Sequence, residues 1–166
     1  MEVSPCTRES IQCLEQLNQS WADMLHHRER WAWQQQGTAI YLLAWQNGQV
    51  VGRTTLLKGS KYDEVRAALP DLWEMNALEA RPQGRGVGTL LIKASEQRAA
   101  ENGVPAFGLA VEPENLGAHR LYQRLGYDEW PQSRVIDEWD EYDELGRLLH
   151  THADDCLYLL KRLIRS

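Results

Sequence analysis

Near the N-terminus, apolar residues recur three to four positions apart, which is the spacing of one helix face. Three residues form the first such stripe: Ile11, Leu14 and Leu17. Thr7 precedes this stripe and has a side chain suited to a helix N-cap. A second stripe begins at Trp21, and Gly37 is a typical residue for a helix end. The pattern therefore predicts two consecutive helices between Thr7 and about Gln36.

The following segment contains two apolar runs joined by Asn47-Gly48, a dipeptide that favours a two-residue hairpin turn. These runs predict a β-hairpin over residues 38–57. The connection over residues 58–70 is more polar and predicts a short helix that Pro70 ends. Residues 72–80, LWEMNALEA, predict a further strand.

The second half of the chain alternates between helix and strand patterns. One helix face carries four apolar residues: Val87, Leu90, Leu91 and Ala94. Asn102-Gly103 closes that helix. The pattern then predicts a strand over residues 104–111, a helix over residues 115–124 and a last strand over residues 155–164. This order predicts a single domain over residues 1–166 of mixed α/β (α+β) class, with a mostly antiparallel central sheet, flanking helices and one central βαβ crossover.

Composition and charge narrow the possible functions. The 166 residues are 43% hydrophobic and 25% charged, which is ordinary for a globular domain. The net charge of −6 argues against an extended nucleic-acid surface, which needs a basic stripe. No apolar run approaches a membrane span, and the N-terminus lacks a secretory signal pattern. Three cysteines without metal-type spacing indicate thiols in a reducing compartment. We therefore expect a cytoplasmic protein that binds neither nucleic acid nor membrane.

A glycine-rich stretch, PQGRGVGTLL, begins at Pro82, where the central helix starts. Glycine disfavours helices, so bare backbone must be required here. The first N–H groups of a helix lack intrahelical partners and carry the positive end of its dipole, which favours a phosphate site. A Walker loop is excluded, because no lysine follows before Lys93. The dinucleotide fingerprint needs glycine or alanine at Thr89, and too few helices follow for a doubly wound sheet, although Glu112 after the next strand keeps this alternative open.

A third pattern, Q/R-x-x-G-x-G/A, is matched in full by Gln83, Gly86 and Gly88. A second motif, NLGAHRLYQRLGY, follows the next strand, and its matching residues are Asn115, Ala118, Leu121, Tyr122, Gly126 and Tyr127. Together the two motifs resemble the GNAT superfamily of acetyl-CoA-dependent N-acetyltransferases, over about residues 38–130. The chain departs from this family at the N-terminus, where the family usually opens with a strand and only residues 1–3 are available. The loop is also about two residues shorter than in many relatives.

The resemblance implies a binding site for acetyl-CoA. Backbone N–H groups of the glycine-rich loop would hold the CoA pyrophosphate, and the residues concerned are Gln83, Gly84, Arg85, Gly86, Val87, Gly88 and Thr89. In the family, the strands before and after this loop splay apart and the pantetheine arm inserts between them, which implies backbone contacts at Leu78 and Ala80. An N–H group near Leu78 would polarise the thioester carbonyl. Asn115 resembles a cofactor-contacting Asn of the family, and a plain N-cap is its alternative role.

Tyr122 and Glu74 are the catalytic candidates that the resemblance indicates. Tyr122 would protonate the leaving CoA thiolate as a general acid, and a core tyrosine is the alternative. Glu74 falls on the family's glutamate base if the loop is two residues short, and burial would raise the pKa of its carboxyl usefully. An ordinary outward carboxylate is the alternative for Glu74, and Glu112 is the reserve base.

Two polar segments near the C-terminus have candidate chemistry of their own. Residues 137–144, DEWDEYDE, combine six acids with Trp139 and Tyr142. They suit either a solvated hairpin or, where the resemblance places them, the mouth of a site for a cationic amine. Residues 150–156, HTHADDC, contain metal-ligating residue types, but their close spacing without a second cluster favours a polar turn and no metal site.

The sequence thus predicts an N-acetyltransferase that moves acetyl from acetyl-CoA to a small-molecule or peptide amine by direct attack, without a metal. The alternative is an inactive acyl-CoA-binding domain that acts as a sensor or interaction module. Domains of this family often form homodimers through their C-terminal strands, so the resemblance implies that this chain forms a homodimer.

Overall fold

The computed structural model describes residues 1–17, 20–132 and 134–163. The strands are β1 Glu2–Pro5, β2 Ala39–Gln46, β3 Gln49–Leu57, β4 Trp73–Ala80, β5 Ala106–Val111, β6 Asp128–Glu129, β7 Val135–Tyr142 and β8 Leu148–Arg162. The helices are α1 Arg8–Gln16, α2 Trp21–Gln35, α3 Asp63–Ala68, α4 Val87–Glu101 and α5 Leu116–Arg124. Ile164, the predicted end of the last strand, lies outside the described residues.

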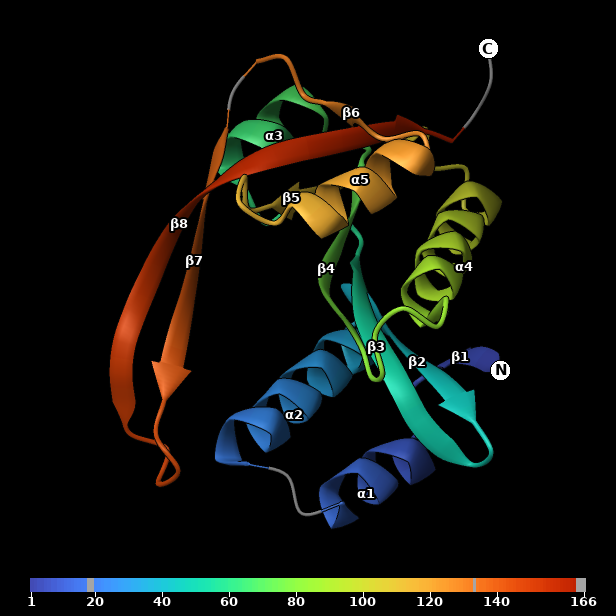
Figure 1. Cartoon of the computed structure of the whole chain (residues 1–166), viewed down its shortest axis with the longest axis vertical. Helices are drawn as coiled ribbons and strands as arrows, with labels where there is room; N and C mark the ends of the chain where they lie inside the picture. The colour runs from blue at the N-terminus through green and yellow to red at the C-terminus, as the bar shows by residue number, and fades with distance from the viewer. Residues whose placement is uncertain (18–19, 133, 164–166) are drawn as a thin grey trace.

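Within the described residues, eight strands form one sheet in the order β1-β2-β3-β4-β5-β8-β6, and β7 pairs with β8 (Figure 1). Neighbouring strands are antiparallel except for β4 and β5, which are parallel and are connected through α4. This topology confirms the predicted α+β class, its mostly antiparallel sheet and its central βαβ crossover.

The N-terminal segment forms a strand, which the sequence pattern did not lead us to expect. β1 pairs with β2 from Glu2 opposite Trp45 to Pro5 opposite Leu42. This pairing satisfies backbone groups of β2 that would otherwise be unpaired at the edge of the sheet. After β1, the predicted cap is confirmed, since Thr7 accepts a hydrogen bond from the Ser10 N–H and the two residues form a capping box.

Alternate residues of β2 pack against helices on opposite faces of the sheet. Tyr41 and Leu43 are completely buried and contact α1 and α2 residues on one face. Leu42 and Ala44 pack on the other face against Val87 and Leu91 of α4. The strand period of two thus fixes α1 and α2 on one side of the sheet and α4 on the other.

The C-terminal hairpin extends beyond the body of the sheet (Figure 1). Residues 157–162 of β8 pair with β5, and residues 148–156 of the same strand pair with β7. The predicted polar turn over residues 150–156 is therefore wrong, because these residues lie inside β8. Cross-strand contacts explain this strand: the ring of His152 stacks on Trp139 at 4.0 Å, and its Nε2 lies 2.8 Å from Glu141 Oε2.

In the part of the chain that the structure describes, no helix has both the length and the apolar composition needed to cross a membrane.

Candidate active site

The glycine-rich loop leaves the N-terminus of α4 open. Gly84 and Gly86 have φ angles of +77° and +79°, which glycine adopts more easily than any other residue. Gly86 is the N-cap and provides no side-chain hydrogen bond. The first helical hydrogen bond joins the N–H of Leu90 to the carbonyl of Gly86, so the N–H groups of the three intervening residues precede it. The Val87 side chain is buried, Gly88 and Thr89 are half-buried, and the loop residues 83–86 are exposed, so an anion can reach the N-terminus of the helix from the loop side.

The parallel strands β4 and β5 separate in front of this helix. Their pairing within the described chain consists of Trp73 opposite Phe107 and Glu74 opposite Gly108. Beyond these pairs lies a pocket of about 260 Å³, which we call the cleft. The residues that line it are Tyr62, Glu74, Met75, Asn76, Ala77, Leu78, Leu109, Ala110, Val111, Glu112, Asn115, Ala118, Tyr122, Asp137 and Cys156. The cleft follows the edge of β4 that β5 leaves unpaired.

A β-bulge interrupts β4 at the cleft. Arg53 pairs with Glu79 and Thr55 pairs with Asn76, so two residues of β4 lie opposite Thr54. Ala77, inside this bulge, has a φ angle of +56°, an uncommon conformation for a residue with a side chain. The bulge therefore turns backbone groups of β4 out of the regular ladder where the cleft begins.

Tyr122 and Asn115, two residues of the second motif, both line the cleft. The Tyr122 side chain is 7% exposed, and burial raises its pKa to about 12. Its hydroxyl has no hydrogen-bond partner among the described residues, and its ring contacts Tyr127 edge-on at 5.7 Å. The Asn115 side chain accepts the N–H of Ala118 at 3.2 Å and so caps α5. Asn115 thus acts as the N-cap of α5, and its contact with a cofactor stays a prediction.

Glu74 is 1% exposed, so the alternative of an ordinary outward carboxylate is wrong. Its Oε2 accepts hydrogen bonds from Ser60 Oγ and Tyr158 OH, both at 2.5 Å, and its Oε1 accepts the N–H of Lys61 at 3.1 Å. Burial raises the pKa of this carboxyl, and the three donors oppose that shift. Gly108 makes the contact possible, because a Cβ there would collide with the ring and hydroxyl of Tyr158.

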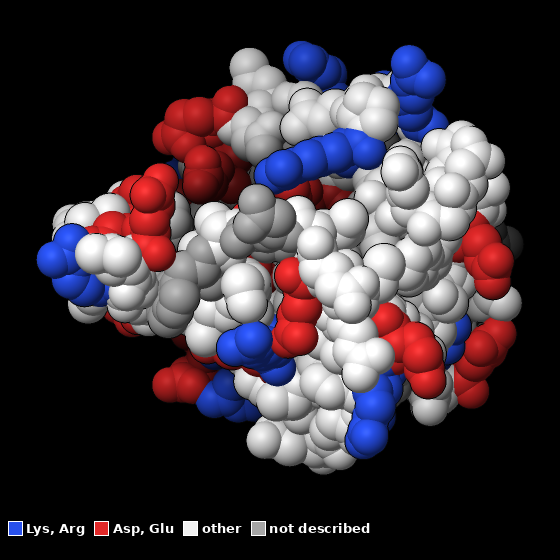
Figure 2. All heavy atoms as spheres, turned by 90° about the horizontal axis from the view of Figure 1, so that it is seen from below, with Lys and Arg blue, Asp and Glu red and all other residues white. Residues whose placement is uncertain are grey.

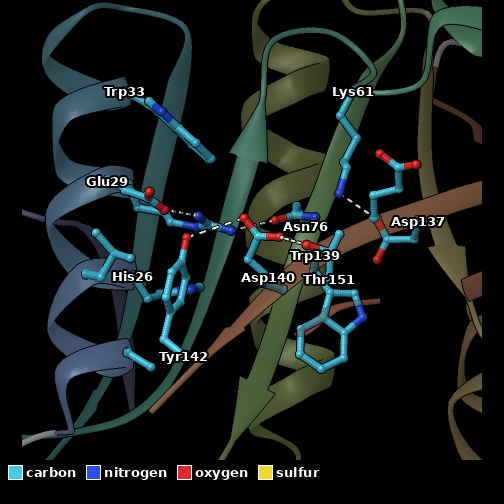
Figure 3. Close-up of a pocket in the computed structure, with 15 residues that line it drawn as sticks. His26, Glu29, Trp33, Lys61, Asn76, Asp137, Trp139, Asp140, Tyr142 and Thr151 are labelled. Carbon is cyan, nitrogen blue, oxygen red and sulfur yellow. Dashed lines mark hydrogen bonds and ion pairs between the residues drawn. The ribbon is translucent and has the colours of Figure 1, made fainter. Parts of the chain in front are cut away.

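A larger pocket of about 740 Å³ adjoins the cleft between α2, the β4 bulge and the β7–β8 hairpin, and we call it the acceptor pocket (Figure 3). Its acidic residues are Glu29, Asp137, Glu138 and Asp140. Its aromatic residues are Trp33, Trp139 and Tyr142, and its basic residues are Arg30 and Lys61. The other three acids of the predicted segment, Glu141, Asp143 and Glu144, do not line it. Glu141 instead pairs with His152, and Asp143 closes the hairpin turn with Arg147.

The sequence alone did not predict that α2 forms one side of this pocket. Its residues recur at helical spacing on one face of α2: Ala22, Leu25, His26, Glu29, Arg30 and Trp33. Arg30 stacks on Trp33 at 4.5 Å and donates from Nη2 to Asn76 Oδ1 at 2.9 Å. Burial, aided by Arg30, lowers the pKa of His26 to about 2, so this ring is neutral at neutral pH. One feature of the sequence could have indicated this side of the pocket. The helix has a stripe of polar and aromatic residues on one face, separate from its apolar stripe.

Charge on the molecular surface is mixed. Figure 2 shows basic and acidic side chains interspersed on the face seen from below, without a continuous basic stripe on that face. Within residues 1–17, 20–132 and 134–163, no three His, Cys, Asp or Glu side chains are arranged to hold a metal ion.

Known proteins resemble this chain in sequence and in fold. Residues 9–127 match the family described as "Acetyltransferase (GNAT) family". An uncharacterised N-acetyltransferase of Bacillus subtilis (strain 168) is 30% identical over 93 residues, which are 55% of this chain and 60% of that protein. A mycothiol acetyltransferase of Mycobacterium leprae is 37% identical over 78 residues, 43% of this chain and 25% of that protein. The matched region thus spans less than two thirds of either relative.

Solved structures share the fold along nearly the whole chain. A putative acetyltransferase from Salmonella typhimurium, solved with its cofactor acetyl-CoA, has a TM-score of 0.67 at 18% identity, over 100% of this chain and 95% of that one. An aminoglycoside 6'-N-acetyltransferase complexed with coenzyme A has a TM-score of 0.65 at 14% identity, over 100% and 99% of the two chains. Because the family match covers most of the sequence, this chain belongs to the acetyltransferase (GNAT) family.

Proposed function

We propose that this protein transfers an acetyl group from acetyl-CoA to an amine by direct attack, without an acyl-enzyme. The observation that carries the proposal is the adjacency of three features. Leu78 of the cleft packs against the cluster that contains Val87, the first residue of α4, and the cleft shares residues with the acceptor pocket. The helix N-terminus suits the diphosphate of CoA, the cleft suits the thioester, and the acceptor pocket suits the amine.

The pyrophosphate of CoA would bind the backbone N–H groups at residues 83–89, because these groups precede the first helical bond of α4. The pantetheine arm would lie along the unpaired edge of β4 and bond the backbone at Leu78 and Ala80. The bulge at Ala77 supports an oxyanion site, since it frees backbone groups beside the cleft. Asn115 would contact the arm from the start of α5.

Tyr122 would assist departure of the CoA thiolate. Its raised pKa keeps the hydroxyl protonated at neutral pH, so it is available as a donor. Complete transfer to an isolated thiolate, with a pKa near 8.5 in cysteine, would be uphill. We therefore assign Tyr122 a hydrogen bond that strengthens as negative charge develops on sulfur. Tyr122 gives its proton to sulfur only as it receives one from the attacking nitrogen, so no tyrosinate is left behind.

Glu74 remains a predicted base, with Glu112 as the reserve. Against this role, both oxygens of Glu74 are already engaged by three donors, and the side chain is almost completely buried. These contacts favour a structural role, in which Glu74 holds β4 close to Tyr158 just before the two strands separate.

The acceptor would be a cationic small-molecule or peptide amine. Four carboxylates and two basic side chains line the acceptor pocket, so its formal charge is −2 (four acids less two bases). Trp33, Trp139 and Tyr142 add aromatic surfaces that attract cations. Cys6, Cys13 and Cys156 are free thiols, which fits the predicted cytoplasmic location. Formation of a homodimer stays a prediction.

The experiment is turnover of acetyl-CoA, followed as thiol release, across a panel of primary amines: butylamine, 1,4-diaminobutane, lysine and an aminoglycoside. We expect a higher kcat/KM for the diamine than for butylamine, and a decline with salt as screening increases. Tight CoA binding in calorimetry without turnover of any amine would instead support the alternative, an inactive acyl-CoA-binding module.

A further inference from the structure

The cleft and the acceptor pocket meet at three residues. Asn76 and Ala77 of β4 and Asp137 of β7 line both. Asp137 is the titratable one of the three. Its position follows from the β7–β8 hairpin, which brings β7 past the β4 bulge, and Figure 3 shows the side chain at the edge of the pocket with Lys61 pointing toward it. A carboxylate here faces both the thioester site and the amine site of the proposed function.

Two side chains hold Asp137 through one of its oxygens. Lys61 Nζ donates to Oδ1 at 2.5 Å, and Tyr62 OH donates to the same oxygen at 2.9 Å. Tyr62 is itself buried and contacts Tyr158 edge-on at 5.8 Å, so its hydroxyl has a fixed place. No described residue is hydrogen-bonded to Oδ2, and the Asp137 side chain is 27% exposed. The carboxylate is therefore oriented and has one oxygen free for a ligand.

The other carboxylates of the region lack this combination. Glu74 has donors on both oxygens, and Glu112 lines the cleft only. Three more acids line the acceptor pocket only: Glu29, Glu138 and Asp140. Asp140 is also hydrogen-bonded through both oxygens, to Thr151 and Tyr142. Asp137 alone among the described acids lines both spaces with an unengaged oxygen.

From this geometry we infer that Asp137 is the catalytic base that receives the ammonium group of the acceptor and removes its proton, an inference that rests on the proposed acetyltransferase function. Oδ2 takes one proton from the ammonium. The freed lone pair forms the C–N bond with the thioester carbon, and the C–S bond breaks with its electron pair on sulfur. The second nitrogen proton passes to sulfur through Tyr122, and Asp137 returns its proton to solvent. The products are the acetamide, CoA thiol and one proton.

The test compares Asp137→Asn with wild type on the panel amine that wild type turns over fastest. An alkyl ammonium has a pKa of about 10.4, so about one molecule in 10³ is free amine at neutral pH. Without its catalytic base, the variant can acetylate only the acceptor molecules that are already unprotonated. We expect kcat to fall about 10²-fold at neutral pH, with unchanged CoA affinity in calorimetry. The kcat/KM of the variant should then rise about tenfold per pH unit toward the amine pKa, a slope that wild type lacks.

Glu144→Gln is the matched control, because it removes a carboxylate from the same hairpin outside both pockets. It should retain wild-type kcat and pH dependence. Asp137→Ser provides the same comparison if the Asn variant folds poorly by circular dichroism. A higher KM with unchanged kcat, or a loss that alkaline pH does not restore, would overturn the base role and leave the acetyltransferase proposal standing. Absence of turnover by wild type would overturn both.

Discussion

The hydroxyl of Tyr158 should contribute measurably to stability through Glu74. Tyr158→Phe keeps a ring that is completely buried and deletes the donor of the 2.5 Å bond to Oε2. A hydrogen bond to a charged group contributes about 1.5–3 kcal/mol, and the carboxylate that loses it stays buried. We therefore expect the free energy of unfolding to fall by about 2 kcal/mol. For a chain of this size, that loss lowers Tm by about 4–8 °C.

The size of this loss should depend on pH. Burial raises the pKa of Glu74 in the folded protein above its usual 4.5. The protonated carboxyl therefore contributes its full share of stability below pH 4.5, and this contribution is lost as pH rises through the folded-state pKa. Removing a donor to the carboxylate raises this pKa further. The deficit of Tyr158→Phe should therefore be larger at about pH 8 than at about pH 5, and Glu74→Gln should flatten the wild-type pH dependence.

Urea unfolding followed by tryptophan fluorescence measures both effects. Tyr122→Phe is the matched control, because it removes the hydroxyl of another buried tyrosine that has no hydrogen-bond partner among the described residues. Its unfolding midpoint should change little. An unchanged midpoint for Tyr158→Phe, or an equal deficit at both pH values, would refute the reasoning and leave Glu74 available as the base.

Three further substitutions test the site. Gly86→Val places a β-branched residue at a φ of +79° and a side chain among the N–H groups of the loop, so CoA affinity in calorimetry should fall at least about tenfold while circular dichroism stays native. Tyr122→Phe should lower kcat about 10²-fold with little change in CoA affinity; full activity would make it a core residue. Gly108→Ala should lower Tm, because its Cβ collides with Tyr158, at a cost of about 1–3 kcal/mol; an unchanged Tm would contradict the tight approach.

Local patterns carried much of the fold. Asn47-Gly48 forms the predicted two-residue turn between β2 and β3, since both residues have positive φ angles. The glycines at 84 and 86 adopt left-handed conformations at the start of α4, as a need for bare backbone predicts. Such features depend on a few neighbouring residues, so the sequence expresses them directly. The strand β1 was missed because its formation depends on β2, which lies about forty positions away.

By itself, the sequence determined the helices and strands of the central region, the open helix N-terminus and the identity of the motif residues. Only the tertiary structure decided what surrounds each carboxylate. Glu74 is enclosed by Ser60 and Tyr158, while Asp137, 63 positions later, reaches the β4 bulge from another strand and keeps an oxygen free. The physical reason is that hydrogen bonding and burial of a side chain depend on residues distant in sequence, and no local pattern encodes them.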